Sequence, residues 1–472
     1  MAKNKLKILF CSYECAPFFK RGGLGDVALG LPKALNDLGH QARVIIPKYK
    51  QINARKWKIK IFRRNIPIKF GNKIYKINIY RTNLPRNRGV AYFIDHAIFK
   101  TKDIFDKRSM ERYVFYSKCV LDFIRWEGWK PDVIHANDWH TGAIFVYLNK
   151  LKKADPWYQD IGTLYTIHNL AYQGKGLADY NKWGLGPEDF KNKKELNLMS
   201  EGILGTDLIN TVSRTYAKEI LGKQYGQGLE SFLRKRKKDL YGIVNGVDDE
   251  YFDPGTDSEL PRRYDKNSIS KKRSNKQALQ KRVKLPQEDV PIISMISRLA
   301  YQKGFNLVLD IMPELLEKYD FQLVIMGHGD EAITKSLKEL AKKNPKKVKA
   351  LTFFGSPALA KLIYAGSDIF LMPSRFEPCG LGQLISMRYG TIPVVRRTGG
   401  LNDTVDQVRG KKGTGFVFDK FKAEDFKRAV SAALNAYQKP AKWKKIVKNA
   451  MSVDSTWIKA AKKYIELYKK IN

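Results

Sequence analysis

Two cationic residues in the second half of the chain have the types and spacing needed to bind a diphosphate. Arg298 follows an apolar run, and Lys303 opens the helical pattern that comes next. A guanidinium can grip a phosphate with paired hydrogen bonds, whereas a lysine supplies a mobile point charge. Further along, Arg397–Leu401 reads Arg-Thr-Gly-Gly-Leu, whose amides and Thr398 hydroxyl can bind the same group. Ordinary surface ion pairs are the alternative that these residues leave open.

A glycine-rich loop near the start of the chain has similar chemistry. The segment Phe19–Val27 contains Lys20, Gly22 and Gly23 directly before a helical pattern. Glycines let a ligand approach the backbone closely, and the first N–H groups of a helix bind anions. The loop matches neither the dinucleotide-binding nor the Walker A pattern, which disfavours dehydrogenase and ATP-hydrolysis functions. A plain tight turn is the structural alternative.

A carboxylate, Glu377, lies in a turn restricted by Pro378, shortly after the apolar run Ile369–Met372. At the carboxyl edge of a sheet, such a group can accept hydrogen bonds from sugar hydroxyls or stabilise positive charge developing at an anomeric carbon. A role as a helix N-cap is the alternative for this residue.

Two histidine-bearing segments favour a carbohydrate ligand. His135–Gly142 contains Asp138 next to a tryptophan, and Thr166–Gly174 contains His168 near a tyrosine. Aromatic rings provide apolar surface for a sugar ring, while its hydroxyls need polar partners. Satisfied structural histidines at strand ends are the alternative. No spacing supports a zinc site, and no Gly-x-Ser-x-Gly elbow supports a serine hydrolase.

The elements that position these residues alternate along the whole chain. Short apolar runs predict strands at Lys7–Ser12, Ala42–Ile46, Val90–Ile94, Asp132–His135, Thr163–Ile167, Leu208–Val212, Gly242–Val244, Pro291–Ser297, Gln322–Met326, Ala350–Phe354, Ile369–Pro373 and Ile392–Arg396. Amphipathic stretches predict helices at Asp26–Leu38, Arg112–Glu127, Asn306–Lys318, Glu331–Lys343, Pro357–Ala365 and Leu381–Tyr389. This alternation predicts an α/β fold with parallel sheets covered on both faces, whose ligands bind beyond the carboxyl ends of the strands.

The pattern breaks between about Phe252 and Val290, in a charged stretch that predicts a linker. At roughly 150 residues per domain, the 472 residues suggest two or three domains. We therefore expect two doubly wound, Rossmann-like domains facing a cleft, the first over residues 1–250 and the second over 251–455.

Composition excludes several other classes of protein. Hydrophobic residues make up 43% of the chain, which is too much for a disordered protein, and no run reaches the roughly 18 apolar residues of a membrane span. The four cysteines show no Cys-x-x-Cys spacing, which disfavours a disulfide scaffold and predicts the cytoplasm.

The net charge of +40, from 87 basic and 47 acidic residues, raises the possibility of nucleic-acid binding. However, the lysines lie in scattered runs with the pattern of helix surfaces and turns, without interleaved aromatic residues. We therefore predict solvated surface lysines and no nucleic-acid partner.

Taken in order, the chemical segments resemble those of the bacterial glycogen synthases and plant starch synthases that use ADP-glucose. The matching segments are KRGGLGDV (Lys20–Val27), HANDWHTG (His135–Gly142), TIHNLAYQG (Thr166–Gly174), IVNGVD (Ile243–Asp248), SRLAYQKG (Ser297–Gly304), SRFEPCGL (Ser374–Leu381) and RTGGL (Arg397–Leu401). The resemblance implies a GT-B fold, with residues 456–472 forming a helix that crosses back onto the first domain. It also implies a transferase, free of metal and other cofactors, that moves glucose from a nucleotide sugar to the non-reducing end of an α-1,4-glucan with retention of configuration.

The same resemblance implies roles for individual residues. Arg298 and Lys303 are expected to bind the donor diphosphate, and Lys20 to help close the cleft. Further donor contacts are expected from Gly22, Gly23, Thr398, Gly399, Gly400, Cys379, Gly380 and Leu381. The implied contacts to the transferred glucose are Asp138, His168 and Asn245. Glu377 is expected close to the donor sugar. The predicted catalytic set is Glu377, His168, Arg298, Lys303 and Asp138.

The chemistry that this implies is a front-face displacement in which the leaving phosphate helps to deprotonate the acceptor hydroxyl. Glu377 is the one motif carboxylate that we consider for a covalent alternative.

The chain departs from the family pattern where the nucleotide base is expected to bind. The stretch Lys100–Arg112 lacks the tyrosine that the family usually has there, and an aromatic expected near Gly355 occurs as Phe354. Two alternatives therefore stay open: a synthase that prefers UDP-glucose, and a glycan-binding protein without turnover.

Overall fold

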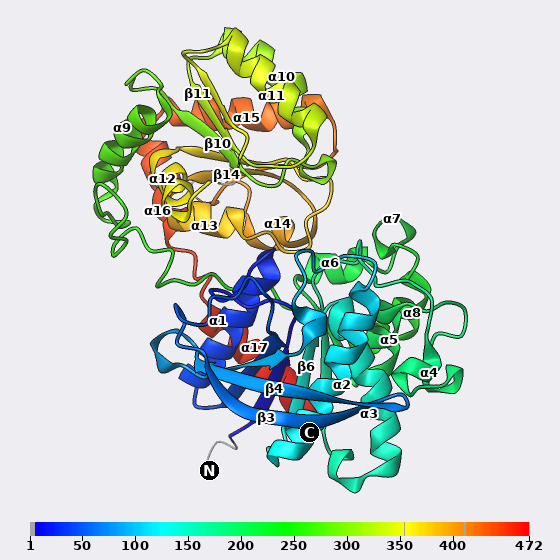
Figure 1. Ribbon diagram of the computed structural model, residues 1–472. Helices are drawn as coiled ribbons and strands as arrows, with labels where there is room; N and C mark the ends of the chain where they lie inside the picture. Colours follow the sequence, from blue (N-terminus) through cyan, green and yellow to red (C-terminus); the bar gives the residue numbers. More distant parts are fainter. Residues whose placement is uncertain (1–4, 354, 410–411, 472) are drawn as a thin grey trace. The chain divides into compact units, whose positions relative to one another are not determined.

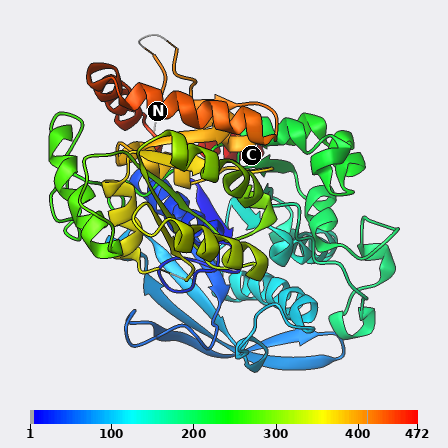
Figure 2. The same cartoon turned by 90° about the horizontal axis from the view of Figure 1, so that it is seen from above.

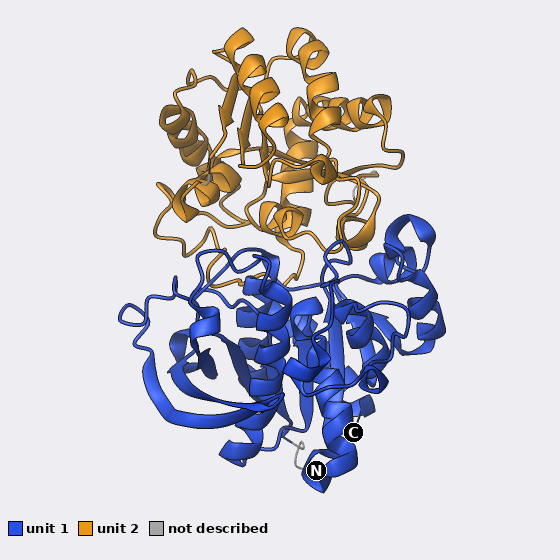
Figure 3. Cartoon of the chain, turned by 45° about the vertical axis from the view of Figure 1, so that its right-hand side comes forward, with its two compact units in different colours: residues 1–246, 456–472 blue, residues 247–455 orange. Residues whose placement is uncertain are grey.

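The computed structural model describes residues 5–353, 355–409 and 412–471. The chain forms two compact units, the first made of residues 1–246 and 456–472 and the second of residues 247–455 (Figure 3). The division expected after residue 250 is found after Gly246. The last segment groups with the first unit rather than with the second.

One sheet of the first unit runs in the order β3-β4-β5-β2-β1-β6-β7-β8-β9 (Figure 1). Its parallel strands are β1 (Lys7–Cys11), β2 (Gln41–Pro47), β5 (Val90–Asp95), β6 (Val133–Asn137), β7 (Gly162–Ile167), β8 (Leu208–Thr211) and β9 (Leu240–Gly242). On one side of β1 the sheet continues with β2 and β5, and on the other side it continues with β6, β7, β8 and β9. The crevice for a ligand in such a sheet lies where the order reverses, at the carboxyl ends of β1 and β6.

Two further strands, β3 (Lys60–Phe70) and β4 (Lys73–Asn83), are antiparallel to their neighbours. They form one edge of the first unit, visible as the long blue strands of Figures 1 and 2. The expectation of a wholly parallel sheet is therefore wrong here. The sequence does contain the alternation typical of a strand, since Ile66, Ile68 and Phe70 are buried between exposed residues. The lysines and arginines of the same stretch made it look like a polar loop.

Helices α1 (Gly23–Asp37) and α17 (Trp457–Ile471) pack against each other, and α2 (Ser109–Glu127) packs against α3 (Ala143–Ala154). Because right-handed crossovers place helices from the two halves of such a sheet on opposite faces, these pairs cover its two sides. The remaining α-helices of this unit are α4 (Tyr180–Trp183), α5 (Leu198–Gly205), α6 (Arg214–Glu219), α7 (Lys223–Gly226) and α8 (Glu230–Lys235).

The last helix, α17, is joined to the first unit by buried polar contacts. The imidazole of His135 on β6 lies 2.8 Å from the Tyr468 hydroxyl and 2.7 Å from the Thr166 hydroxyl. The Tyr464 hydroxyl accepts a hydrogen bond of 2.9 Å from the Asn210 amide on β8. Polar groups buried this deeply must be paired, so the position of α17 on the sheet is fixed by chemistry as well as by shape.

The sheet of the second unit has the order β12-β11-β10-β13-β14-β15, with all its strands parallel. The strands are β10 (Ile292–Ile296), β11 (Gln322–Met326), β12 (Val348–Leu351), β13 (Ile369–Met372), β14 (Ile392–Arg396) and β15 (Phe416–Phe418). The helices are α9 (Lys272–Val283), α10 (Phe305–Lys318), α11 (Glu331–Lys343), α12 (Pro357–Gly366), α13 (Gly382–Arg388), α14 (Gly399–Thr404), α15 (Ala423–Tyr437) and α16 (Pro440–Met451). Here the order reverses between β10 and β13. The predicted strand Ala350–Phe354 ends beyond β12, and Phe354 lies outside the described residues.

The predicted linker contains a helix, α9, that belongs to the second unit. Its Lys272 is buried, and the ammonium donates hydrogen bonds to the carbonyls of Ala365 (2.7 Å) and Tyr389 (3.0 Å). Lys276 is also buried and lies 2.7 Å from Asp368. The sequence suggested an exposed linker because a buried lysine with hydrogen-bond partners cannot be told apart, in a sequence, from a lysine exposed to water.

We predict that Tyr468→Phe destabilises the first unit. The change removes the hydroxyl that lies beside the buried His135 ring nitrogen, and an unpaired buried polar group costs about 1–3 kcal/mol. Urea unfolding of the full chain measures the effect. Tyr180→Phe, where no described residue forms a hydrogen bond with the hydroxyl, is the matched control. Equal stability of the two variants would contradict the structural role of this contact.

Candidate active site

The loop that follows β1 is held by a buried carboxylate, Glu14. Its Oε2 accepts hydrogen bonds from the backbone N–H groups of Arg21 and Gly22, the latter at 3.0 Å. Burial raises the pKa of Glu14, although these N–H groups act to lower it. The predicted ligand-binding residues Lys20, Gly22 and Gly23 therefore lie in a loop with a fixed backbone. Sequence reasoning missed Glu14, whose signal was an acidic residue immediately after a buried strand.

Lys20 lies at the exposed end of this loop. Its ammonium forms an ion pair of 2.7 Å with Asp26 in the first turn of α1, and about half of the lysine side chain is exposed. An exposed pair of this kind contributes little stability, so Lys20 can exchange Asp26 for an anionic ligand at low cost.

Asp138 begins the loop after β6, at the reversal point of the same sheet. Its φ of 55° is a left-handed conformation that few side chains adopt, and its Oδ1 accepts a hydrogen bond of 2.8 Å from the His168 N–H. This bond joins the ends of β6 and β7. Burial raises the pKa of Asp138 to about 7, against the opposing effect of the His168 and Asn169 N–H groups, and the nearby Glu14 adds to the rise.

His168 is a neutral imidazole of known tautomer. Burial lowers its pKa to about 3. Its Nε2 lies 2.9 Å from Asn137 Oδ1, and the amide nitrogen of Asn137 donates to the Cys11 carbonyl at 3.0 Å. Because the amide oxygen can only accept, Nε2 must carry the hydrogen, which leaves Nδ1 of His168 as an acceptor. Asn137 was not among the predicted site residues.

The last predicted residue of the first unit, Asn245, follows β9. Its side chain is 6% exposed, and its amide oxygen is buried without a hydrogen-bond partner among the described residues. A buried polar atom of this kind is costly unless a ligand or water satisfies it. Asn245 therefore has the character of a binding residue.

In the second unit, the loops after β10 and β13 meet through an ion pair. The Lys303 ammonium lies 2.6 Å from Glu377 Oε2, which also accepts a hydrogen bond of 3.0 Å from the Ser374 hydroxyl. Glu377 is only 7% exposed. Gly304 adopts φ 76°, and a Cβ there would overlap the Pro373 carbonyl, which shows how closely the two loops pack. The structure thus brings the predicted Lys303 and Glu377 together, with Ser374 as a support that the sequence analysis did not identify.

The loop after β14 packs on the same segment. The Gly400 N–H donates to the Glu377 carbonyl at 3.0 Å, and a Cβ at Gly399 or Gly400 would overlap the backbone of residues 377–379. Thr398, which precedes α14, and Cys379 are both buried. Cys379 is therefore a small packed residue here, next to Gly380 and Leu381, where α13 starts.

Arg298 differs from the other predicted residues of the second unit. It follows β10 and is exposed, and its guanidinium has no hydrogen bond or ion pair with the described residues. A cation that has no partner in the described part of the chain, and that shares a loop with a lysine held in place by a carboxylate, is suited to a phosphate ligand.

Within the described ranges, no group of three or more His, Cys, Asp or Glu side chains could hold a metal ion. A search of the same residues for a helix long and apolar enough to cross a membrane also finds none.

Comparison with known proteins identifies the family. The starch synthase catalytic domain family matches residues 7–235, and the group 1 glycosyl transferases match residues 276–450. The glycogen synthase of Desulforudis audaxviator is 42% identical, over 99% of this chain and 97% of its own. The chain belongs to the glycogen and starch synthase family. The glycogen synthase of Thermotoga maritima, 41% identical over 98% of this chain and 99% of its own, supports the same assignment.

Solved structures agree with this assignment. The catalytic domain of Starch Synthase IV from Arabidopsis thaliana, bound to ADP and acarbose, has a TM-score of 0.92 and 32% identity over 99% of both chains. A sucrose-phosphate synthase from Thermosynechococcus elongatus, with a TM-score of 0.62 and 16% identity over 99% of both chains, shares the fold. The predicted family and the two-domain GT-B fold class are confirmed, and the chain is a hexosyltransferase. The roles of single residues stay predictions.

We predict that Asp138 makes the chain less stable as the pH rises. Because its pKa is raised to about 7, the folded state binds more protons than the unfolded state between the ordinary carboxyl range and that value. The free energy of unfolding therefore falls through this window, and Asp138→Asn removes that contribution. Urea unfolding of both proteins at about pH 5 and about pH 8 measures the difference. A stability advantage of the native chain that grows with pH would contradict this assignment.

Proposed function

We propose that the chain transfers glucose from ADP-glucose to the non-reducing end of an α-1,4-glucan, with retention of configuration. The observation that carries the proposal is the Lys303–Glu377 pair at the strand-order reversal of the second unit, with Arg298, which has no partner among the described residues, in the same loop after β10. Family membership supports a nucleotide-sugar donor and a glucan acceptor. The related starch synthase that binds ADP supports adenine as the base.

The second unit supplies groups for the diphosphate. Glu377 occupies one hydrogen-bond direction of the Lys303 ammonium, so that two N–H donors are left for phosphate oxygens. Arg298 adds a guanidinium that can bind bidentately. Together they would stabilise the charge that develops on the leaving nucleoside diphosphate, a task that needs cations but no particular metal.

The first unit supplies acceptors for sugar hydroxyls. They are the Asp138 carboxylate, Nδ1 of His168 and the unpartnered Oδ1 of Asn245. Glucose offers several O–H donors, so a set composed of acceptors is complementary to it. These groups would orient the sugar for transfer, and orientation accounts for a large part of enzymatic rate enhancement.

Retention fits a front-face displacement, in which the leaving phosphate takes the proton of the acceptor hydroxyl as the new glycosidic bond forms. Glu377 is the covalent alternative. Because its Oε2 is already bonded to both Lys303 and Ser374, we favour a positioning role for this carboxylate. Mass spectrometry of the protein quenched during turnover tests this step, and a glucosyl adduct on Glu377 would overturn it.

The segment Lys100–Arg112 departs from the family pattern at the place where the nucleotide base is expected to bind. The base of the donor therefore needs a direct test. Arg112 is buried, bonds both carboxylate oxygens of Asp106 and donates to the Ile104 carbonyl at 2.7 Å. Phe105, 47% exposed, contacts the rings of Tyr13 and His140. The segment is thus a loop held in place by hydrogen bonds, and it has an aromatic residue of its own.

We keep the cytoplasm as the expected compartment, because the four cysteines are buried free thiols. We also keep the expectation that the enzyme needs no metal and has no nucleic-acid partner.

We predict glucose transfer to glycogen from ADP-glucose, without added metal, faster than from UDP-glucose. Radiolabelled transfer with the two donors side by side measures this preference. If only UDP-glucose is used, the donor assignment is wrong while the transferase proposal stands. If neither donor is used, the proposed function is overturned in favour of a glycan-binding protein.

We predict that Arg298→Ala lowers kcat/KM for the sugar nucleotide by about 100-fold or more, because a charge-assisted, bidentate phosphate contact is worth about 3 kcal/mol. Arg282→Ala, on the exposed surface of α9 in the same unit, is the matched control and should retain native activity. Steady-state kinetics with varied donor measure both variants. Equal losses would show that net charge, and not this position, matters.

A further inference from the structure

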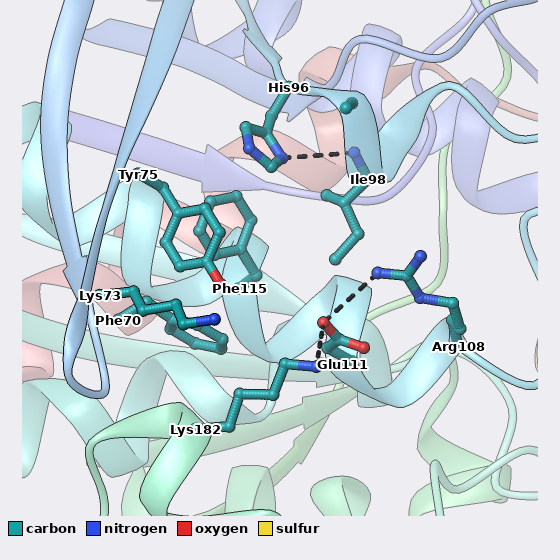
Figure 4. Close-up of a pocket in the computed structure, with 10 residues that line it drawn as sticks. Phe70, Lys73, Tyr75, His96, Ile98, Arg108, Glu111, Phe115 and Lys182 are labelled. Atoms are coloured by element: carbon teal, nitrogen blue, oxygen red, sulfur yellow. Dashed lines mark hydrogen bonds and ion pairs between the residues drawn. The ribbon is translucent and has the colours of Figure 1, made fainter.

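A pocket in the first unit is lined by none of the residues to which a role in glucose transfer is assigned above. Two of its residues, Arg108 and Glu111, come from the segment Lys100–Arg112. The pocket has a volume of about 300 Å³ and is lined by residues of the β3–β4 hairpin, the turn Ala97–Phe99, the start of α2 and α4 (Figure 4). A volume of this size suits a compact small molecule rather than a polymer chain. Nothing in the proposed transfer reaction uses it.

Aromatic rings form one side of the pocket. Phe115 of α2 is buried, with its ring 5.1 Å from that of Phe70 and 5.4 Å from that of Tyr75. Figure 4 shows the Tyr75 ring in front of Phe115, with its hydroxyl directed toward the charged residues. Edge-to-face packing of this kind fixes the rings, so the apolar wall is rigid.

Charged groups form the opposite side. Glu111 Oε1 lies 2.9 Å from the Lys182 ammonium and 3.4 Å from the Arg108 guanidinium, as the dashed lines of Figure 4 show. Burial acts to raise the pKa of Glu111, but hydrogen bonds from these two cations hold it below its usual value, so the group is ionised. Its other oxygen, Oε2, accepts no hydrogen bond from the described residues.

Lys73, at the start of β4, has no partner among the described residues and reaches the pocket from the hairpin side. Burial lowers the pKa of His96, which is therefore neutral, and its Nδ1 accepts from the Ile98 N–H at 3.3 Å. The pocket thus has three cations and one carboxylate. An excess of positive charge in a partly enclosed site favours an anionic ligand.

The hairpin that carries Lys73 is seated firmly. Gly71 at its turn has φ 60°, and a Cβ there would overlap the Asn181 carbonyl of α4. On the other side, a Cβ at Gly184 would lie 3.1 Å from the Gly71 nitrogen. Such close backbone contacts show that the pocket is a built feature of the fold and not a gap between loose side chains.

From these observations we propose that the pocket binds a monosaccharide phosphate. Lys73, Arg108 and Lys182 would bind the phosphate, Oε2 of Glu111 would accept a sugar hydroxyl, and the Tyr75 and Phe70 rings would contact the sugar ring. A neutral glucan end would leave the excess charge uncompensated. Inorganic phosphate would leave the aromatic wall and the free carboxylate oxygen unused.

Isothermal titration of the full chain with glucose 6-phosphate tests the proposal. The phosphate of this probe is not attached at the anomeric carbon, so it does not copy the donor. We expect binding that persists with excess ADP present, and that is at least about tenfold tighter than binding of glucose or of inorganic phosphate. No binding, equally tight binding of glucose or of inorganic phosphate, or displacement by ADP would each overturn the proposal.

A matched pair of variants locates the site. Lys73→Glu should weaken binding of the probe by at least about tenfold, because it reverses a charge in the pocket. Lys76→Glu makes the same change on the same strand, but on the opposite face, and should leave binding unchanged. Both lysines are exposed, and thermal unfolding should show that both variants fold. Equal effects of the two substitutions, or none from Lys73→Glu, would overturn the assignment.

Discussion

The parallel alignment of the two strands at the point where the strand order reverses is the constraint on which the binding loops of each unit depend. We call these loops the half-site of that unit. In the first sheet, Cys11 at the end of β1 pairs with Ala136, one residue before the end of β6. The loops that contain Glu14 and Asp138 therefore leave the sheet side by side. In the second sheet, β10 and β13 are parallel neighbours in the same way. That arrangement brings Lys303 and Glu377, which are far apart in sequence, into contact.

Each unit also uses a buried carboxylate to hold a binding loop. Glu14 fixes the glycine-rich loop through backbone N–H groups, and Glu377 fixes Lys303 through its ammonium. A loop that is already in place loses less entropy when a ligand binds. Two further residues support the site indirectly. Ser374 orients Glu377, and Asn137 orients His168. Rigid positioning, rather than any single reactive side chain, is the common design of the two half-sites.

The sequence predicted the parts of the fold in which local pattern and burial agree. The buried strands and the helix Glu331–Lys343 fall into this class. The antiparallel strand β3 and helix α9 were missed because their lysines and arginines, whether solvated or buried, gave the same polar pattern. Motif residues were identified by type and order. Their supports, such as Glu14, were not, because hydrogen bonds between loops depend on which strands become neighbours.

The return of α17 to the first unit has a consequence for the order in which the protein can be completed. The second unit is one continuous stretch inserted into the first, so all of its strands are available while the ribosome is still working on the chain. The first unit, although it begins at the N-terminus, lacks the tyrosine partners of His135 and Asn210 until Tyr464 and Tyr468 have been synthesised. The unit whose synthesis begins first is therefore the unit that is finished last.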